Sequence, residues 1–334
     1  MFILTAAPDS SELACAELRQ AQADTFFFPD IAPGVMCADG DFFDLADKWR
    51  QNPPIFTRHI CPAQTAVPLR QNESDLTNLQ QAVAELLDLI EPEVPFSVQT
   101  RIFADGLLRP FDVNNALADF IKTETNAPLD VRRPFQILSV VITPDTAYIG
   151  VSLALHNLSD WAGGVRRLAR EKGQISRAEF KLLEALEVFG IELPPRGTAL
   201  DLGAAPGGWT RVLRQREQYV TAVDPADLHP SLQADKQVRH KQMTAEIYFL
   251  NEPDPFDLIV NDMRLDARDS ARLMVEYAPF LYPQGQAIMT LKLPKNNRAP
   301  VLDHSFNILR QAFRIANARQ LFHNRSEITI HLTK

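Results

Sequence analysis

The sequence of 334 residues predicts an α/β fold in its second half, preceded by a smaller α+β region. Three observations support this division. After residue 198, apolar strand-like segments alternate with helical segments, which is typical of a mostly parallel sheet. A glycine-rich turn follows the first of those strands. Residues 1–100, in contrast, are divided into short elements by clustered prolines.

The first half predicts a small sheet with helices on one face. Apolar residues at helical spacing predict a helix over residues 76–90, and Pro92 is its stop signal. The following elements are expected in the order strand, helix, strand, strand. They cover residues 96–103, 113–122, 135–142 and 147–153, and the last two strands are joined by a turn at 143–146.

A polar segment over residues 156–173 marks a domain boundary. The length is sufficient for two or three domains, each with its own core. We expect an α+β domain over residues 1–90, a second over 91–160 and the α/β domain over 161–334. In the last of these, strands are predicted at 198–203, 219–224, 256–261 and 286–293, helices from Gly208 and at 269–281, and a closing hairpin at 316–322 and 327–332.

The formal net charge of −8 is unevenly distributed. Residues 1–100 hold 5 lysines and arginines against 15 aspartates and glutamates, whereas residues 101–334 hold 29 against 27. Residues 166–181 are the most basic stretch, with six basic and two acidic side chains. Such a stretch is either a solvated face or, beside a catalytic cleft, a surface that neutralises phosphates.

Other features exclude several classes of protein. The three cysteines, Cys15, Cys37 and Cys61, have no spacing that would hold zinc, so we expect reduced, buried thiols, no metal and a cytoplasmic location. The first residues lack a signal-peptide pattern, and no run of about 18 apolar residues occurs, so neither secretion nor a membrane span is expected.

The glycine-rich turn, residues 201–209 (DLGAAPGGW), predicts a nucleoside site. Glycines allow a ligand to approach the backbone, and the helix that follows presents free N–H groups. Asp224, 21 positions after Gly203, ends the next strand, where a carboxylate can accept both ribose hydroxyls. A dinucleotide is the alternative, but Ala205 replaces the glycine that admits a pyrophosphate, and Pro206 stiffens the turn. S-adenosylmethionine has no pyrophosphate, so it fits this turn better than a dinucleotide does. A turn that only packs the strand against the helix, without a ligand, is the structural alternative.

Four further polar residues are candidates for chemistry. Lys181 lies on a helix that enters the α/β domain, Asp262 follows an apolar strand, Lys292 interrupts an apolar strand and Glu327 begins the last hairpin. Each has a structural alternative: a solvated surface for Lys181 and Glu327, a helix cap for Asp262 and a side chain that reaches solvent along the strand for Lys292. Lys292 is the hardest to explain structurally, because a charge in a central strand is unfavourable unless it is paired or functional.

Together these residues resemble the K-D-K-E tetrad of the FtsJ-like RNA ribose 2′-O-methyltransferases. The resemblance is strongest to the bacterial group that methylates a cytidine of 23S rRNA. It is carried by residues 176–189, 201–210, 223–225, 261–263, 291–298 and 319–332. Residues 96–155 look similar to a THUMP domain, which binds RNA, and residues 1–90 resemble that group's ferredoxin-like N-terminal domain.

The resemblance implies a Rossmann-like class I methyltransferase domain that uses S-adenosylmethionine and leaves S-adenosylhomocysteine. It makes Lys292 the proton acceptor, while Lys181, Asp262 and Glu327 orient it and the target hydroxyl. It also implies a set of residues around the cofactor: Ser176, Gly203, Ala205, Pro206, Gly207, Gly208, Trp209, Asp224, Thr244 and Asp262. Thr244 departs from the family, which has an acidic residue at the adenine edge, but a hydroxyl can still bond the adenine amino group.

Two forms of the chemistry remain open at this point. Lys292 accepts the hydroxyl proton if burial and the neighbouring Lys181 lower its pKa, or as an ammonium it stabilises the developing alkoxide while water takes the proton. The expected partner is RNA, specifically 23S rRNA, and the expected state is a monomer. The alternatives are a 2′-O-methyltransferase of another RNA such as tRNA, a catalytically silent RNA-binding or ribosome-assembly factor and, remotely, a nicotinamide oxidoreductase.

Overall fold

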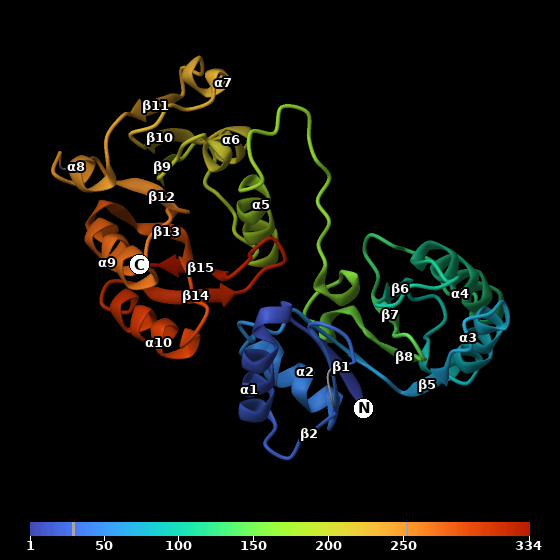
Figure 1. Ribbon diagram of the computed structural model, residues 1–334. Coiled ribbons are helices and arrows are strands. Elements are labelled where there is room, and N and C mark those ends of the chain that lie inside the picture. Colours follow the sequence, from blue (N-terminus) through green and yellow to red (C-terminus); the bar gives the residue numbers. More distant parts are fainter. Residues whose placement is uncertain (29–30, 252) are drawn as a thin grey trace. The chain divides into compact units, whose positions relative to one another are not determined.

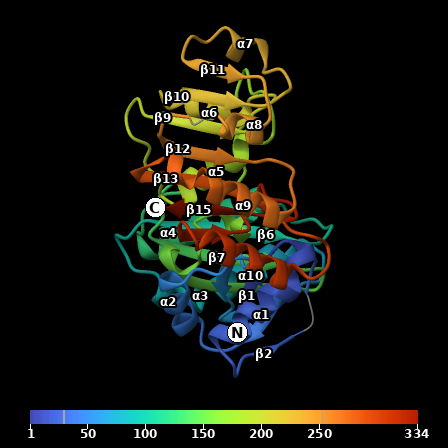
Figure 2. The same cartoon turned by 90° about the vertical axis from the view of Figure 1, so that its left-hand side faces the viewer.

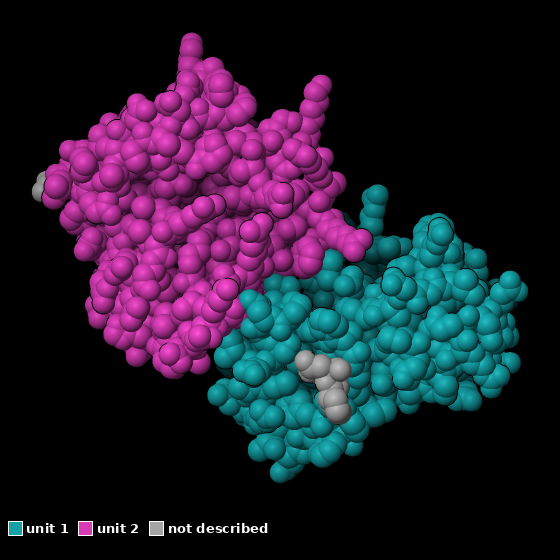
Figure 3. Space-filling model, in the orientation of Figure 1, with its two compact units in different colours: residues 1–165 teal, residues 166–334 magenta. Residues whose placement is uncertain are grey.

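The chain divides at residue 165 into two units, residues 1–165 and 166–334 (Figure 3). The computed structural model describes residues 1–28, 31–251 and 253–334. This division lies five residues beyond the predicted boundary at 160/161. Within the described residues, no helix has the length and apolarity needed to cross a membrane.

The first sheet of unit 1 has the order β2-β3-β1-β4 and is antiparallel. Its strands are β1 (Phe2–Thr5), β2 (Phe26–Phe27), β3 (Val35–Asp39) and β4 (His59–Pro62), and its helices are α1 (Ser11–Ala21) and α2 (Phe42–Gln51). Helix α2 begins where the Asp41 carboxylate accepts the N–H groups of residues 43 and 44. It buries Phe42, Leu45, Ala46 and Trp49, which form one helical face.

The second sheet of unit 1 has the order β5-β8-β7-β6 (Figure 1). Its strands are β5 (Thr65–Pro68), β6 (Phe96–Ile102), β7 (Gln136–Ile142) and β8 (Thr146–Leu153), with helices α3 (Ser74–Ala84) and α4 (Pro110–Thr125). The predicted strand, helix and hairpin are present, since β6 and β7 are parallel and β7 and β8 antiparallel. Both helices share one core with the sheet.

Two details of unit 1 differ from expectation. Strand β5 pairs with β8, so residues 65–84 belong to the second sheet, and the two sheets do not separate at residue 90. The predicted helix over 76–90 ends at Ala84, because the Leu86 N–H bonds to the carbonyl only three residues earlier and begins a 3₁₀ turn. Leu86 and Ile90 are still buried, so the apolar spacing does mark a packed segment.

Unit 2 is one seven-stranded sheet with the order β11-β10-β9-β12-β13-β15-β14, and Figure 2 shows the strands from β11 to β15 one above another. Only β15 runs antiparallel to its neighbours. The strands are β9 (Thr198–Leu202), β10 (Tyr219–Val223), β11 (Val238–Lys241), β12 (Phe256–Asn261), β13 (Leu281–Lys292), β14 (Arg314–Arg319) and β15 (Glu327–Thr333). The helices are α5 (Glu179–Val188), α6 (Gly208–Gln215), α7 (Pro230–Gln233), α8 (Ala245–Phe249), α9 (Ala267–Tyr277) and α10 (Arg298–Leu309). The predicted mostly parallel sheet and its closing hairpin are therefore present.

The strand order places a crevice at one edge of this sheet. From β9 the chain moves outward to β10 and β11, and then crosses to β12 and β13 on the other side. In open α/β sheets, ligands bind beyond the carboxyl ends of strands where the order reverses in this way. Leu202 of β9, Asn261 of β12 and Met289 of β13 are in register there. The glycine-rich turn and Asp262 thus leave the sheet side by side.

Candidate active site

The four polar residues that the sequence singles out lie together in unit 2. Lys181 is on α5, Asp262 directly follows β12, Lys292 ends β13 and Glu327 begins β15. Lys292 and Glu327 are opposite each other on the antiparallel pair β13 and β15. Asp262 lies beside them because β12 and β13 are parallel neighbours. The fold therefore brings all four side chains to the crevice edge of the sheet.

These side chains form one cluster of ion pairs. Lys181 Nζ lies 3.2 Å from Asp262 Oδ1 and 3.1 Å from Oδ2, and it also pairs with Glu327 Oε1. Lys292 Nζ donates to Asp262 Oδ1 and lies 3.4 Å from Glu327 Oε2. Each carboxylate thus contacts both lysines. The side chains are between 10% and 21% exposed, so neither Lys181 nor Glu327 is a solvated surface group.

The cluster stabilises the charged forms of two of its members. Burial disfavours the ammonium of Lys181, but the carboxylates of Asp262 and Glu327 outweigh burial and raise the Lys181 pKa above its ordinary value. Burial likewise disfavours the carboxylate of Asp262, but Lys292 and Lys181 outweigh it and lower the Asp262 pKa. At neutral pH, Lys181 is therefore a cation and Asp262 an anion.

Thr290 belongs to the same cluster, although sequence reasoning missed it. Its hydroxyl donates to Asp262 Oδ1 at 2.6 Å and accepts from Lys292 Nζ, and its side chain is fully buried. The available signal was its position two residues before Lys292, because alternate residues of a strand point to the same face. The alternative role of Asp262 as a helix cap is wrong, since Asp266 caps α9 by accepting the Arg268 N–H at 3.0 Å.

Local contacts fix the position of the Lys181 helix. The buried Glu179 carboxylate accepts the N–H groups of Ile175 at 2.6 Å and Ser176 at 3.3 Å, which resembles a capping box at the start of α5. Its other oxygen pairs with Arg211 of α6 at 2.6 Å. One turn beyond Lys181, Glu184 accepts the N–H groups of residues 322 and 323 at 2.9 Å each. Helix α5 is thereby tied both to α6, the helix that follows the glycine-rich turn, and to the loop that precedes Glu327.

The glycine-rich turn has a backbone that side chains would disrupt. Gly203 has φ +71°, and a Cβ there would lie 2.4 Å from Cγ of Met263. Gly207 has φ +108°, and a Cβ there would lie 2.1 Å from Cδ1 of the buried Leu232. The contact with Met263 also shows that the turn touches the segment that carries Asp262.

The groups around the turn fit a nucleoside. A Cβ on residue 208 would lie 2.2 Å from Ser176 Oγ, and this buried hydroxyl has no hydrogen-bond partner among the described residues. The Asp224 carboxylate accepts the N–H groups of Ala205 at 3.1 Å and Ala226 at 2.8 Å. Since two carboxylate oxygens offer about four acceptor positions, Asp224 retains capacity for the hydroxyls of a ribose.

Two predicted cofactor residues have structural partners of their own. The Trp209 indole is buried in the core beneath the turn, and its Nε1 donates to the Ala178 carbonyl at 2.8 Å. The Thr244 hydroxyl is the N-cap of α8 and accepts the Ile247 N–H at 3.4 Å.

A buried carboxyl lies on β9, beneath the turn. Asp201 accepts from the Thr210 hydroxyl of α6 at 2.6 Å, and burial raises its pKa to about 7. In the described parts of the chain, no group of three or more histidine, cysteine, aspartate or glutamate side chains could hold a metal ion.

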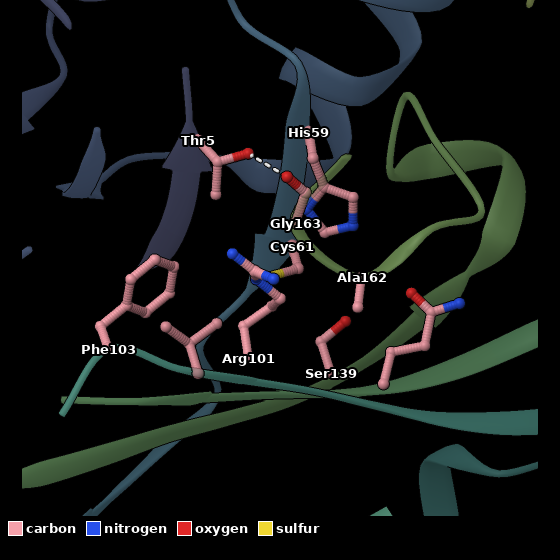
Figure 4. A pocket seen from close by; sticks show the side chains of 10 residues that line it. Thr5, His59, Cys61, Arg101, Phe103, Ser139, Ala162 and Gly163 are labelled. Carbon is pink, nitrogen blue, oxygen red and sulfur yellow. Dashed lines mark hydrogen bonds between the residues drawn. The ribbon is translucent and has the colours of Figure 1, made fainter. Parts of the chain in front are cut away.

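Unit 1 contains a small cavity of about 10 Å³, lined by residues of both its sheets (Figure 4). His59 and Cys61 of β4 face Arg101 of β6 and Ser139 of β7 across it. His59 is 2% exposed, and neither ring nitrogen has a hydrogen-bond partner in the described residues. Cys37 and Cys61 are buried as expected, but Cys15 is only partly buried.

We expect the stability of unit 1 to fall in mild acid because of His59. Burial, together with the nearby Arg101 charge, lowers the His59 pKa to about 3, whereas an unfolded histidine titrates near pH 6.5. The contribution of the neutral His59 to the free energy of unfolding is therefore fully present above pH 6.5. It is lost as the pH falls towards 3, and the loss is about 2 kcal/mol at pH 5. Urea denaturation at pH 7.5 and 5.0 measures this loss. His59→Gln should remove this loss of stability between pH 7.5 and 5.0. The control His304→Gln, at an exposed histidine, should retain it. An equal loss in wild type and in His59→Gln would contradict the assignment to His59.

Comparison with known families defines the class of unit 2. Residues 174–293 match the family model of FtsJ-like methyltransferases, the family that the tetrad and the glycine-rich turn resemble. S-adenosylmethionine is the cofactor expected for such a domain.

Particular relatives carry the name ribosomal RNA large subunit methyltransferase M. The protein of Halorhodospira halophila is 36% identical over 174 residues, which cover 51% of this chain and 50% of that protein. The protein of Tolumonas auensis is 31% identical over 222 residues, covering 61% and 58%. That of Methylococcus capsulatus is 33% identical over 202 residues, covering 56% and 55%. The chain thus spans about half the length of the curated relatives it matches.

Proposed function

We propose that this protein transfers the methyl group of S-adenosylmethionine to a ribose 2′-hydroxyl of RNA, with a cytidine of 23S rRNA as the target. One observation carries the proposal. Two lysines and two carboxylates contact one another directly beside a glycine-rich nucleoside turn, within a domain that matches the FtsJ-like methyltransferases. The relatives named as rRNA methyltransferases support the choice of ribosomal RNA.

The residues around the turn would hold the cofactor. The Asp224 carboxylate would accept the ribose hydroxyls, and the orphaned Ser176 hydroxyl and the backbone of residues 203–208 would line the site. Thr244 would lie at the adenine edge, and Asp262 would join the cofactor site to the tetrad. When bound, S-adenosylmethionine supplies an electrophilic methyl group on a sulfonium sulfur. The chain itself must therefore activate only the ribose hydroxyl.

Lys292 is the group that acts on that hydroxyl. A ribose 2′-hydroxyl is a weak acid, so its proton must leave as its oxygen forms the new bond. Lys292 either takes this proton through a neutral amine or, as an ammonium, stabilises the negative charge on the oxygen while water takes the proton. Lys181, Asp262 and Glu327 hold Lys292 Nζ in place, and Thr290 adds a hydrogen bond from the same strand.

The proposal assigns unit 1 to RNA recognition. Its second sheet contains the strands of residues 96–155, a region that resembles a THUMP domain in sequence. Residues 1–90, which resemble a ferredoxin-like domain, contribute the four strands of the first sheet and strand β5 of the second. We place the protein in the cytoplasm, where it would act as a monomer.

Methyl transfer from isotope-labelled S-adenosylmethionine to RNA tests this function. We expect the purified chain to label 23S rRNA taken from cells that lack its gene. We also expect ribose-methylation mapping to show one cytidine that is methylated in normal cells and unmethylated in those cells. If the 23S rRNA map is unchanged and tRNA is labelled instead, the substrate is another RNA. Binding of S-adenosylhomocysteine and RNA without any transfer would instead indicate a silent assembly factor.

A further inference from the structure

The tetrad itself carries no net charge with which to hold RNA. It consists of two lysines and two carboxylates, and each carboxylate contacts both lysines. Every ribose in RNA, however, has a negatively charged phosphate on each side of it. A site for a ribose 2′-hydroxyl therefore needs cations outside the tetrad.

Three exposed cations lie next to the tetrad in sequence, on three separate loops. Arg264 comes two residues after Asp262, Lys295 three residues after Lys292 and Arg325 two residues before Glu327. Because a residue spans at most about 3.6 Å, each lies within about 7 to 11 Å of its tetrad neighbour, Cα to Cα. The loops leave the same edge of the sheet, and Leu293 N–H bonds to the Ser326 carbonyl at 3.1 Å beyond the last strand pair.

These three cations differ from other exposed cations of unit 2. Arg268 pairs with Asp266 at 2.9 Å, and Arg272 pairs with Asp269 at 2.6 Å. Among the described residues, no carboxylate lies within ion-pair distance of Arg264, Lys295 or Arg325. The loop segments 293–298 and 319–326 contain no aspartate or glutamate at all. Outside the tetrad, the loop that holds Arg264 contains one carboxylate, Asp266, which pairs with Arg268. The region around the tetrad is therefore locally cationic, although the whole chain has a net charge of −8.

We propose that Arg264, Lys295 and Arg325 form a phosphate-binding rim that holds the RNA backbone on both sides of the target ribose. This inference rests on the proposed function and adds the residues that position its substrate. Three loops approach the tetrad from different strands, so the rim can contact phosphates both before and after the target nucleotide. Unpaired cations lose no ion pair of their own when they bind phosphate, which favours these residues over Arg268 and Arg272.

The salt dependence of RNA binding tests the rim. Fluorescence anisotropy of the full chain with a 20-nucleotide oligocytidine RNA, between 50 and 300 mM KCl, gives the slope of log affinity against log salt. Each phosphate contact to single-stranded RNA contributes about −0.7 to this slope. We expect the triple variant Arg264→Gln, Lys295→Gln, Arg325→Gln to have a slope about 2 less steep, a weaker affinity and a raised KM for RNA. Its affinity for S-adenosylhomocysteine should equal that of wild type, which shows that the domain is folded.

A matched control removes the same number of charges elsewhere on unit 2. The triple variant Lys236→Gln, Arg268→Gln, Arg272→Gln should retain the wild-type slope and affinity. Equal slopes for wild type and the rim variant, or no binding of this RNA by wild type, would overturn the rim. RNA binding is measured without catalysis, so the two proposals can fail separately. If the rim variant has a reduced slope but the wild-type protein transfers no methyl group, the proposed function is contradicted and the rim is supported.

Discussion

Replacing Lys292 with methionine is expected to lower kcat for RNA methylation by about 10²–10⁴-fold, the usual contribution of a group that handles a proton or a developing charge. Methionine keeps most of the length of the side chain but removes the ammonium that contacts Asp262 and Glu327. Asp262 retains Lys181 as a partner at 3.1 Å, so its charge is not left uncompensated. Single-turnover methyl transfer measures the effect, and calorimetry with S-adenosylhomocysteine checks that the cofactor site is intact.

An arginine at the same position separates the two forms of the chemistry. Arginine keeps the positive charge but does not deprotonate in proteins, so it can stabilise an alkoxide but cannot accept the proton. If Lys292 accepts the proton, Lys292→Arg should be as inactive as Lys292→Met; if it acts as a cation, Lys292→Arg should retain part of the activity. Lys236→Met, on an exposed loop, is the control. A Lys292→Met enzyme that binds cofactor and RNA and still methylates at the wild-type rate would exclude both forms.

Replacing Gly207 with alanine is expected to weaken S-adenosylhomocysteine binding by about 10- to 100-fold, which corresponds to about 1.4 to 2.8 kcal/mol. Two effects combine at this position. The φ of +108° is unfavourable for any residue with a Cβ, with a strain on the order of 1–3 kcal/mol. The added Cβ would also lie 2.1 Å from Cδ1 of Leu232, so the turn or the side chain must move. Calorimetric titration with S-adenosylhomocysteine measures the change.

Gly190 provides a matched control for this substitution. It has φ +60°, and a Cβ there would meet no atom within 4 Å. Gly190→Ala should therefore lower the free energy of unfolding by about 1–2 kcal/mol through backbone strain alone and leave cofactor affinity unchanged. If Gly207→Ala bound S-adenosylhomocysteine as tightly as wild type, the turn would not form the cofactor site.

The expected elements agree with the structure where the signal is local. The strands at 198–203, 219–224 and 256–261 and the hairpin near 316–332 are present, because apolar runs and alternation record which residues are buried. The helix over 76–90 is shorter than expected, since its last apolar residues pack from a 3₁₀ turn. The boundary between the two sheets of unit 1 was not predictable locally, because the β5 pairing with β8 joins residues about 80 positions apart.

Some features of the candidate site are likewise visible in the sequence, whereas others appear only in the structure. The sequence alone indicated the glycine-rich turn and the acidic residue after the next strand, and the resemblance to a known family singled out the four tetrad residues, whose catalytic role stays a prediction. Only the tertiary structure decided that Lys292 pairs with Glu327 across two strands, that Thr290 joins them and that Glu179 and Glu184 hold the Lys181 helix. Strand order and register, which bring together residues far apart in the chain, set these contacts, and no local pattern encodes them.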